Sequence, residues 1–314
     1  MDEFSLIRHY FSGLTAAQRD VVLGIGDDCA LLNIPADCEL AVTTDTLVAG
    51  RHFPEITRPF DIGWKALAVN LSDLAAMGAE PRWFTLALSL PTVDAHWLQE
   101  FCRGLKTLAD LFKIALVGGD TTRGTLSLTI TAMGVLPRGK AIKRSGAKAG
   151  DLICVTGTLG DAALALQLLN DGVLEGESEL LLRLNRPVPR VAAGIALREL
   201  VHAAIDLSDG LAGDLGHMLS ASGTGAVIDV AKLPMSAEFQ RLSTAVSCLP
   251  LQAQGGDDYE LCFCISPDQL NNARAAVDVP LSVIGRVTDK PGLRFVDVDG
   301  ATIPASPTGY RHFT

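Results

Sequence analysis

The sequence lacks several features that mark common classes of protein. No run approaches the roughly 18 apolar residues of a membrane-spanning helix, and the start Met1-Asp2-Glu3 does not resemble a signal peptide. Lys and Arg number 26 against 36 Asp and Glu, which gives a formal charge of −10. Because nucleic-acid-binding surfaces select positive charge, we expect neither a nucleic-acid nor a membrane partner. The seven cysteines form no CxxC pair, which favours reduced thiols and a cytoplasmic location.

Familiar catalytic and nucleotide-binding motifs are missing as well. The six histidines form no HExxH pattern, and Ser208 has no histidine nearby in the sequence. Gly24-Ile25-Gly26 does not continue as GxGxxG. Gly134–Ala141 imitates a P-loop, but an alanine replaces the Ser or Thr that would hold Mg²⁺ and a proline interrupts it. Gly157–Asp161 is open to two interpretations, an anion site at a helix start or a plain strand-to-helix turn.

One kind of short segment does recur: a carboxylate set among apolar, glycine or threonine residues. The longest, Val69–Gly78, is small and apolar almost throughout, with Asp73 at its centre, and is typical of a buried helix segment. A lone buried carboxylate costs on the order of several kcal/mol unless a cation or hydrogen-bond donors meet it. Four further segments share this composition: Gly24–Asp28, Thr43–Thr46, Val117–Thr122 and Ile205–Gly210.

Any one of these aspartates could simply cap a helix or turn a loop. Five such segments in one chain favour a different hypothesis, in which the carboxylates converge on metal ions. Aspartate-rich loops with no obvious general base suit phosphoryl transfer, where catalysis is mostly positioning and charge neutralisation by Mg²⁺. This ion prefers one or two carboxylates together with waters and phosphate oxygens.

The length and periodicity predict an α/β (α+β) protein of two mixed domains. At 314 residues and 48% hydrophobic content, the chain exceeds one ordinary domain and can bury a large core. The polar, basic run 138–151 is the expected boundary, which gives domains at 1–138 and 151–314 and a linker at 139–150. Each half has a strand that ends in an Asp-Gly or Gly-Asp cluster, which indicates two related halves facing a shared cleft. Helices are predicted at 4–14, 61–77, 94–112, 161–169, 191–200 and 210–221, and strands at 21–23, 30–32, 40–44, 83–90, 114–117, 126–135, 151–155, 203–207, 226–230, 259–265, 282–287 and 293–296.

The motifs together resemble the thiamine-monophosphate kinase family, which belongs to the superfamily of aminoimidazole ribonucleotide synthetase and selenophosphate synthetase. The similarity spans nearly the whole chain, from Glu3–Ile7 to Gly309–Phe313. The family usually has Gly-Gly-Glu-Asp-Tyr-Glu where this chain has Asp257 in place of the first glutamate. The matching motifs, in order, are Gly24–Asp28, Thr43–Phe53, Asn70–Gly78, Gly118–Thr122, Arg144-Ser145-Gly146, Asp206–Gly210 and Gly255–Leu261.

This resemblance implies a phosphotransferase that converts ATP and thiamine phosphate into ADP and thiamine diphosphate, with more than one Mg²⁺ ion. It implies a homodimer joined through the N-terminal sheets, with the ATP cleft between the two domains. By similarity, ATP would contact Gly119, Asp120, Arg144 and Ser208, and thiamine phosphate would contact His52, Asp257 and Tyr310. The expected metal ligands, direct or through water, are Asp28, Thr43, Thr44, Asp45, Asp73, Asp120, Asp206 and Asp209.

The chemistry of the acceptor agrees with this interpretation. A phosphate monoester has a second pKa near 6, so its oxygen is already anionic at neutral pH and needs no general base. We therefore expect direct transfer with no catalytic base. Structural alternatives stay open for three residues: Arg144 as an exposed linker cation, His52 as a structural polar group, and Tyr310 as a pin for the chain terminus.

Three other functions share the superfamily core or its fold. A selenophosphate synthetase would share the ATP and metal sites, but no reactive cysteine lies in a glycine-rich N-terminal segment. An aminoimidazole ribonucleotide synthetase would differ in the substrate that it turns over. A non-catalytic maturation partner would bind a protein in its cleft.

Overall fold

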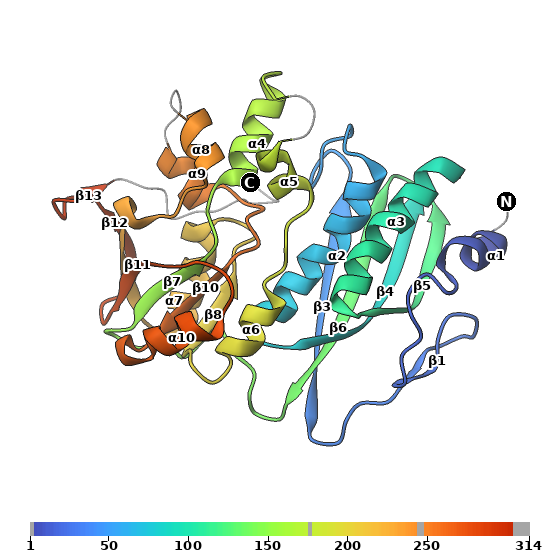
Figure 1. Cartoon of the computed structure of the whole chain (residues 1–314), viewed down its shortest axis with the longest axis horizontal. Helices are drawn as coiled ribbons and strands as arrows, with labels where there is room; N and C mark the ends of the chain where they lie inside the picture. The colour runs from blue at the N-terminus through green and yellow to red at the C-terminus, as the bar shows by residue number, and fades with distance from the viewer. Residues whose placement is uncertain (1–2, 175–177, 244–247, 304–314) are drawn as a thin grey trace. The chain divides into compact units, whose positions relative to one another are not determined.

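The computed structural model describes residues 3–174, 178–243 and 248–303 (Figure 1). The chain forms two compact units. The first comprises Met1–Leu74 and Ala79–Gly139, and the second comprises Ala75–Gly78 and Lys140–Thr314. Each unit has its own sheet. None of the helices in the described ranges is long and apolar enough to cross a membrane.

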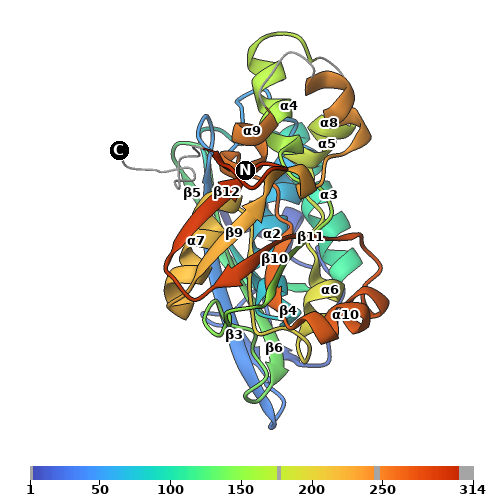
Figure 2. The same cartoon turned by 90° about the vertical axis from the view of Figure 1, so that its left-hand side faces the viewer.

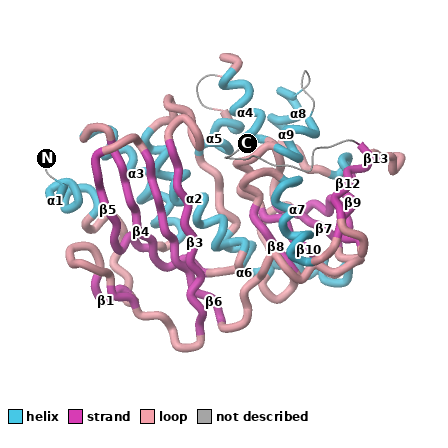
Figure 3. The backbone as a smooth tube through the Cα atoms, turned by 180° about the vertical axis from the view of Figure 1, so that it is seen from behind, coloured by secondary structure: helices cyan, strands magenta, loops and turns pink. Residues whose placement is uncertain are grey.

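The first unit is built on a four-stranded sheet with the strand order β3-β6-β4-β5. Only the β4–β5 pair is parallel. Two long helices, α2 and α3, lie along one face of the sheet in Figure 1, and Figure 3 turns the opposite face toward the viewer. The elements of this unit are α1 (Glu3–Leu6), η1 (Ile7–Phe11), β1 (Val21–Leu23), β2 (Leu31–Leu32), β3 (Cys38–Val48), α2 (Pro59–Ala76), β4 (Glu80–Leu90), α3 (Ala95–Phe112), β5 (Ala115–Arg123) and β6 (Ser127–Pro137).

Helix α3 has clear sequence signals at both ends and at its contact with α2. The Asp94 carboxylate accepts hydrogen bonds from the amides of His96 and Trp97, which satisfies donors of the first turn. Lys113 ends the helix in a left-handed conformation. At Gly104, a Cβ atom would lie 1.9 Å from the carbonyl oxygen of Phe60, so the absence of a side chain allows the two helices to approach closely.

The two faces of the sheet differ in chemistry because side chains alternate along each strand. Phe84, Leu86 and Leu88 of β4 are buried on the face that carries the helices. On the opposite face, Thr44 and Thr46 of β3 exchange hydroxyl hydrogen bonds of 2.9 and 2.8 Å with Thr131 and Thr129 of β6, respectively. A ladder of hydroxyl groups therefore crosses the face that Figure 3 presents.

The second unit is built on a seven-stranded sheet with the order β13-β12-β9-β11-β7-β10-β8. Helix α7 packs on one face, and α6 and α10 pack on the other (Figure 2). A separate hydrophobic cluster is formed between α4, α5, α8 and α9. The elements are β7 (Leu152–Thr156), α4 (Asp161–Asn170), α5 (Glu179–Asn185), α6 (Val191–Leu197), β8 (Ala203–Asp206), α7 (Leu211–Ser222), β9 (Gly225–Asp229), η2 (Val230–Lys232), α8 (Ala237–Leu242), α9 (Cys248–Gln254), β10 (Leu261–Ile265), η4 (Pro267–Gln269), α10 (Leu270–Ala276), β11 (Leu281–Thr288), β12 (Gly292–Val296) and β13 (Thr302–Ile303).

The predicted α/β class is confirmed, with two differences among the helices. The expected N-terminal helix is a short α-helix that continues as a π-helical turn. Helices α5, α8, α9 and α10 were not predicted, since each has only six or seven residues and shows too little periodicity. The first half of the P-loop-like segment, Gly134–Pro137, is the end of strand β6.

Candidate functional site

The segment Val69–Gly78 forms the later part of α2 and the turn after it, and is buried as predicted. Within this part of α2, Asp73 is only half-buried, whereas its neighbours Leu71, Ser72 and Leu74 are fully buried. The Thr43 hydroxyl of β3 donates a hydrogen bond to the Asp73 carboxylate. A strand residue and a helix residue of the expected metal set are thus in direct contact.

The other expected ligands of the first unit divide between the two faces of the sheet. Asp45 follows Thr43 by two residues, so both belong to the face that the helices cover. Strand register places Thr44 on the opposite face, and Asp120 of β5 lies beside Ala87 on that same face. Asp28 is exposed in the loop after β1, where its amide donates to the Asp27 carboxylate.

Two expected contact residues of this unit also have structural roles. Gly119 has φ +150°, and a Cβ atom there would lie 1.9 Å from the carbonyl oxygen of Leu86, so glycine is required for β5 to pair with β4. His52 accepts a 3.0 Å hydrogen bond at Nδ1 from the amide of Val48. In the neutral ring this leaves the proton on Nε2. The backbone contact fixes the orientation of the ring.

In the second unit, the Asp206–Gly210 segment links the end of β8 to the start of α7. Asp206 is buried, and Ser208 and Asp209 are half-buried. The Asp214 carboxylate, in the first turn of α7, accepts a 3.0 Å hydrogen bond from the amide of Asp209. Burial raises the pKa of Asp214 to about 7, and the hydrogen bond from the Asp209 amide opposes this rise. Asp214 was not predicted, although an acid in the first turn of a helix is a recognisable signal.

The segment that carries Asp257 lies against this loop. The amide of Asp257 donates to the carbonyl oxygen of Ser208 at 2.9 Å, and the amide of Tyr259 donates to that of Leu207 at 2.8 Å. Two motifs about 50 residues apart in the sequence are therefore brought together by backbone pairing. This proximity places the expected substrate contact Asp257 beside the expected ATP contact Ser208.

Arg144 is exposed, and its backbone is held by the far end of α7. The Ser222 hydroxyl donates to the carbonyl oxygen of Arg144 at 3.2 Å and accepts from the amides of Gly146 and Ala147 at 3.2 Å each. The Arg144 guanidinium lies near enough to Asp214 to favour its ionised form. Tyr310 lies outside the described residues.

A buried ionic network anchors the residues that follow Asp257, and it was not predicted from the sequence. Glu260 is fully buried and receives two 2.6 Å hydrogen bonds from Arg190, in a bidentate arrangement, and one of 2.7 Å from Arg183. The Asp258 carboxylate accepts from the amide of Gly160 at 2.9 Å. This contact takes up one amide at the helix start where an anion site was considered.

The side-chain atoms that these segments offer as metal ligands suit Mg²⁺, because all of them are carboxylate or hydroxyl oxygens. Among the described residues there is no group of three or more His, Cys, Asp or Glu side chains arranged to hold a metal. Mg²⁺ commonly takes only one or two carboxylates and completes its shell with water and phosphate oxygens. Pairs such as Thr43 with Asp73 fit that requirement.

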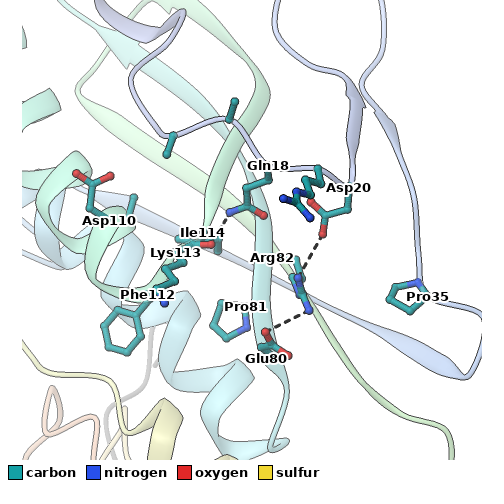
Figure 4. A pocket seen from close by; sticks show the side chains of 14 residues that line it. Gln18, Asp20, Pro35, Glu80, Pro81, Arg82, Asp110, Phe112, Lys113 and Ile114 are labelled. Atoms are coloured by element: carbon teal, nitrogen blue, oxygen red, sulfur yellow. Dashed lines mark hydrogen bonds and ion pairs between the residues drawn. The ribbon is translucent and has the colours of Figure 1, made fainter.

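A separate cavity of about 630 Å³ lies in the first unit, near the end of α3 and the start of β4 (Figure 4). Three of its charged groups are paired with one another: Arg82 forms ion pairs of 3.4 Å with Asp20 and 3.2 Å with Glu80. The Gln18 amide donates to the carbonyl oxygen of Lys113 at its edge. None of the expected site residues lines it.

Comparisons with known proteins agree over nearly the whole chain. Two family models match: "AIR synthase related protein, N-terminal domain" over residues 26–136, and the corresponding C-terminal domain over residues 148–298. The thiamine-monophosphate kinase of Salmonella typhimurium is 50% identical over 319 aligned residues, which cover 99% of this chain and 98% of the relative.

Solved structures give the same result. Thiamine-monophosphate kinase from Stenotrophomonas maltophilia K279a matches with a TM-score of 0.88 and 48% identity, covering 95% of this chain and 97% of that one. The structure of AaThiL complexed with AMPPCP and TMP has a TM-score of 0.80 and 30% identity, covering 99% and 97%. The hydrogenase maturation protein HypE of E. coli, at 22% identity, a TM-score of 0.81 and coverage of 99% and 98%, shares the fold alone. This chain belongs to the thiamine-monophosphate kinase family.

Proposed function

We propose that this chain transfers the γ-phosphoryl group of ATP to thiamine phosphate, giving ADP and thiamine diphosphate. The observation that carries the proposal is the 50% identity to a thiamine-monophosphate kinase over 99% of the chain. The AaThiL complex supports the same two substrates, since it holds TMP together with AMPPCP, an analogue of ATP.

The transfer needs charge neutralisation more than acid–base catalysis. The acceptor phosphate is largely ionised at neutral pH, so no side chain has to remove its proton. The main obstacle is repulsion between the acceptor and the γ-phosphate, which Mg²⁺ relieves when bound. Two of the proposed Mg²⁺ ligands, Thr43 and Asp73, are hydrogen-bonded to each other, which supports their belonging to one site. The full set of proposed ligands is Asp28, Thr43, Thr44, Asp45, Asp73, Asp120, Asp206 and Asp209.

The remaining residues would bind and orient the two substrates. In the second unit, Ser208 and Asp257 are joined by a backbone hydrogen bond, which supports adjacent contacts to ATP and thiamine phosphate. Helix α7 contacts the Asp209 amide at its start and the Arg144 segment at its end. These contacts would fix the positions of the two nucleotide-binding segments. The set proposed by similarity is completed by Gly119, Asp120, His52 and Tyr310.

We propose that the protein is a homodimer formed through the helix-free face of the N-terminal sheet, which is the face opposite α2 and α3. On β3, Leu40 and Val42 are exposed on the same face as Thr44 and Thr46. Apolar and hydroxyl side chains in alternate positions suit burial against a second sheet better than prolonged exposure to water. The resemblance to the family implies a dimer joined through the N-terminal sheets.

A cytoplasmic location is also part of the proposal. All seven cysteines are free thiols, and Cys102, Cys154, Cys262 and Cys264 are buried. This state is typical of proteins in reducing compartments.

The proposal is tested by ADP release with a panel of acceptors. We expect Mg·ATP-dependent ADP release with thiamine phosphate and none above background with selenide or formylglycinamidine ribonucleotide. Turnover of either alternative acceptor would assign a superfamily synthetase instead. ATP binding with no turnover of any acceptor would favour a non-catalytic maturation partner. Omitting Mg²⁺ is the control, since it should abolish release with every acceptor.

A further inference from the structure

The backbone around Asp257 is unusual for side-chain-bearing residues. Asp257 has φ +68° and Tyr259 has φ +50°, both in the left-handed region. Among the described residues, Lys113 is the third non-glycine residue with positive φ, and it ends a helix. Left-handed backbone costs a residue other than glycine on the order of 1 kcal/mol or more. Such strain persists only where the surroundings hold it in place.

Contacts on both sides of the segment hold this conformation. Backbone hydrogen bonds tie Asp257 to Ser208, and Tyr259 to Leu207. The intervening Asp258 points inward to the amide of Gly160, and Glu260 points inward to Arg190 and Arg183. Both anchoring carboxylates are almost completely buried.

The consequence of this backbone is that the side chains of Asp257 and Tyr259 meet. The Tyr259 hydroxyl donates a 3.1 Å hydrogen bond to Oδ1 of Asp257. The tyrosine is 8% exposed, so its ring is fixed by packing, whereas Asp257 is half-buried and accessible. A rigid donor therefore orients the carboxylate of a residue that is only half-buried.

We propose that Tyr259 is a positioning residue that aims the Asp257 carboxylate at the organic part of thiamine phosphate. The proposal rests on the proposed function. Asp257 is shorter by one methylene than the glutamate usual in the family, so its carboxylate lies closer to the backbone and within reach of the Tyr259 hydroxyl. Tyr259 acts on substrate affinity and not on nucleotide affinity.

Tyr259→Phe tests the proposal, because it keeps the ring and removes only the hydroxyl. Loss of one hydrogen bond to a charged group weakens binding roughly ten- to a hundredfold. We expect the KM for thiamine phosphate to rise by that factor, while the KM for ATP and the melting temperature stay unchanged. Tyr10→Phe is the matched control: its hydroxyl donates to the carbonyl oxygen of Ala95 at 3.4 Å in the first unit, and we expect no change in any of these values.

A double-mutant cycle with Asp257→Asn separates positioning from general structure. If Tyr259 acts through Asp257, adding Tyr259→Phe to Asp257→Asn raises the KM no further. A full, multiplicative effect in the Asn background, or an equal rise in both KM values, overturns the proposal while leaving the kinase assignment intact. A wild-type protein that does not turn over thiamine phosphate overturns the proposed function and this proposal together.

Discussion

Asp73 is the residue for which the expectation from sequence composition and the observed structure agree most directly. Its segment was recognised as a buried helix around a single carboxylate, and the structure adds the Thr43 hydroxyl as a hydrogen-bond donor. The donor lies 30 positions away in the sequence and comes from a strand, so spacing along the chain could not reveal it.

Asp73→Asn is expected to keep the fold and lose activity. The amide oxygen still accepts from Thr43, but the charge that would attract Mg²⁺ is gone. Even residues that only support metal ligands change affinity or activity by roughly 10- to 100-fold, so kcat/KM should fall at least that far. Wild-type melting temperature should rise with Mg²⁺ and AMPPCP, and the variant should lose most of that rise. Near-normal turnover by the variant would remove Asp73 from the site.

Asp258 provides a prediction about pH. Burial raises its pKa well above an ordinary value of 3.8, so the folded state retains this proton after the unfolded state has lost it. Stability is therefore highest below about pH 4 for this group and declines as the pH rises. Asp258→Asn cannot ionise, yet its amide oxygen can still accept from Gly160. The melting temperature of the variant relative to wild type should thus increase from pH 4 to pH 7.

Asp229 is the control for this experiment because its pKa shift has the opposite sign. Its half-buried carboxylate is hydrogen-bonded to Lys232, which lowers its pKa. Asp229→Asn should therefore become slightly less favourable relative to wild type as the pH rises toward about 4, and should show no further trend from pH 4 to pH 7. If the Asp258 and Asp229 variants show the same trend, burial is not the cause of the Asp258 shift.

At the scale of elements, α7 connects two segments that the sequence presents separately. Asp214 in its first turn holds the Asp209 amide, and Ser222 at its last residue holds the Arg144 segment. The helix itself was predicted over nearly its true length from its apolar spacing. The contacts at its ends were not, because they are side-chain-to-backbone bonds between distant parts of the chain.

Ser222→Ala is expected to loosen the Arg144 segment without unfolding α7. The change removes an acceptor for two amides and a donor to one carbonyl oxygen. With a net contribution of roughly 1 kcal/mol per hydrogen bond, the KM for ATP should rise several-fold. The KM for thiamine phosphate should change little.

Ser220→Ala is the matched control, since Ser220 is exposed on the same helix. Both kinetic constants should be unchanged in this variant. If Ser222→Ala behaves like Ser220→Ala, the Arg144 segment is held adequately by other contacts and α7 does not position it.

The predicted elements show what local patterns can and cannot reveal. Long helices such as α3 were found because a cap at Asp94 and strong periodicity coincide. Strand β3 was predicted over five residues and runs for eleven, since its hydroxyl-rich half resembles a loop until β6 is placed beside it. The network of Glu260 with two arginines was missed because burial of charge depends on tertiary partners, 70 and 77 positions away.

At the scale of the whole molecule, the proposed homodimer would bury the exposed face of the N-terminal sheet in its interface. Val42 is 57% exposed on the helix-free face, and a lysine there would place charge in an interface of two sheets. Val42→Lys should convert a dimer into a monomer, as measured by light scattering coupled to size-exclusion chromatography. Leu111→Lys changes a residue that is 60% exposed on α3 and should leave the mass unchanged. A wild-type protein that is monomeric at micromolar concentration would contradict the proposal.

Transfer of label from ATP tests the central claim most directly. The protein is incubated with γ-labelled ATP and Mg²⁺, with and without thiamine phosphate, and small molecules and protein are then separated. The account predicts label in thiamine diphosphate when the acceptor is present, and no labelled protein when it is absent, because transfer is direct. Label that accumulates on the protein and then passes to the acceptor would contradict direct transfer, and thiamine diphosphate without label would contradict the assigned reaction.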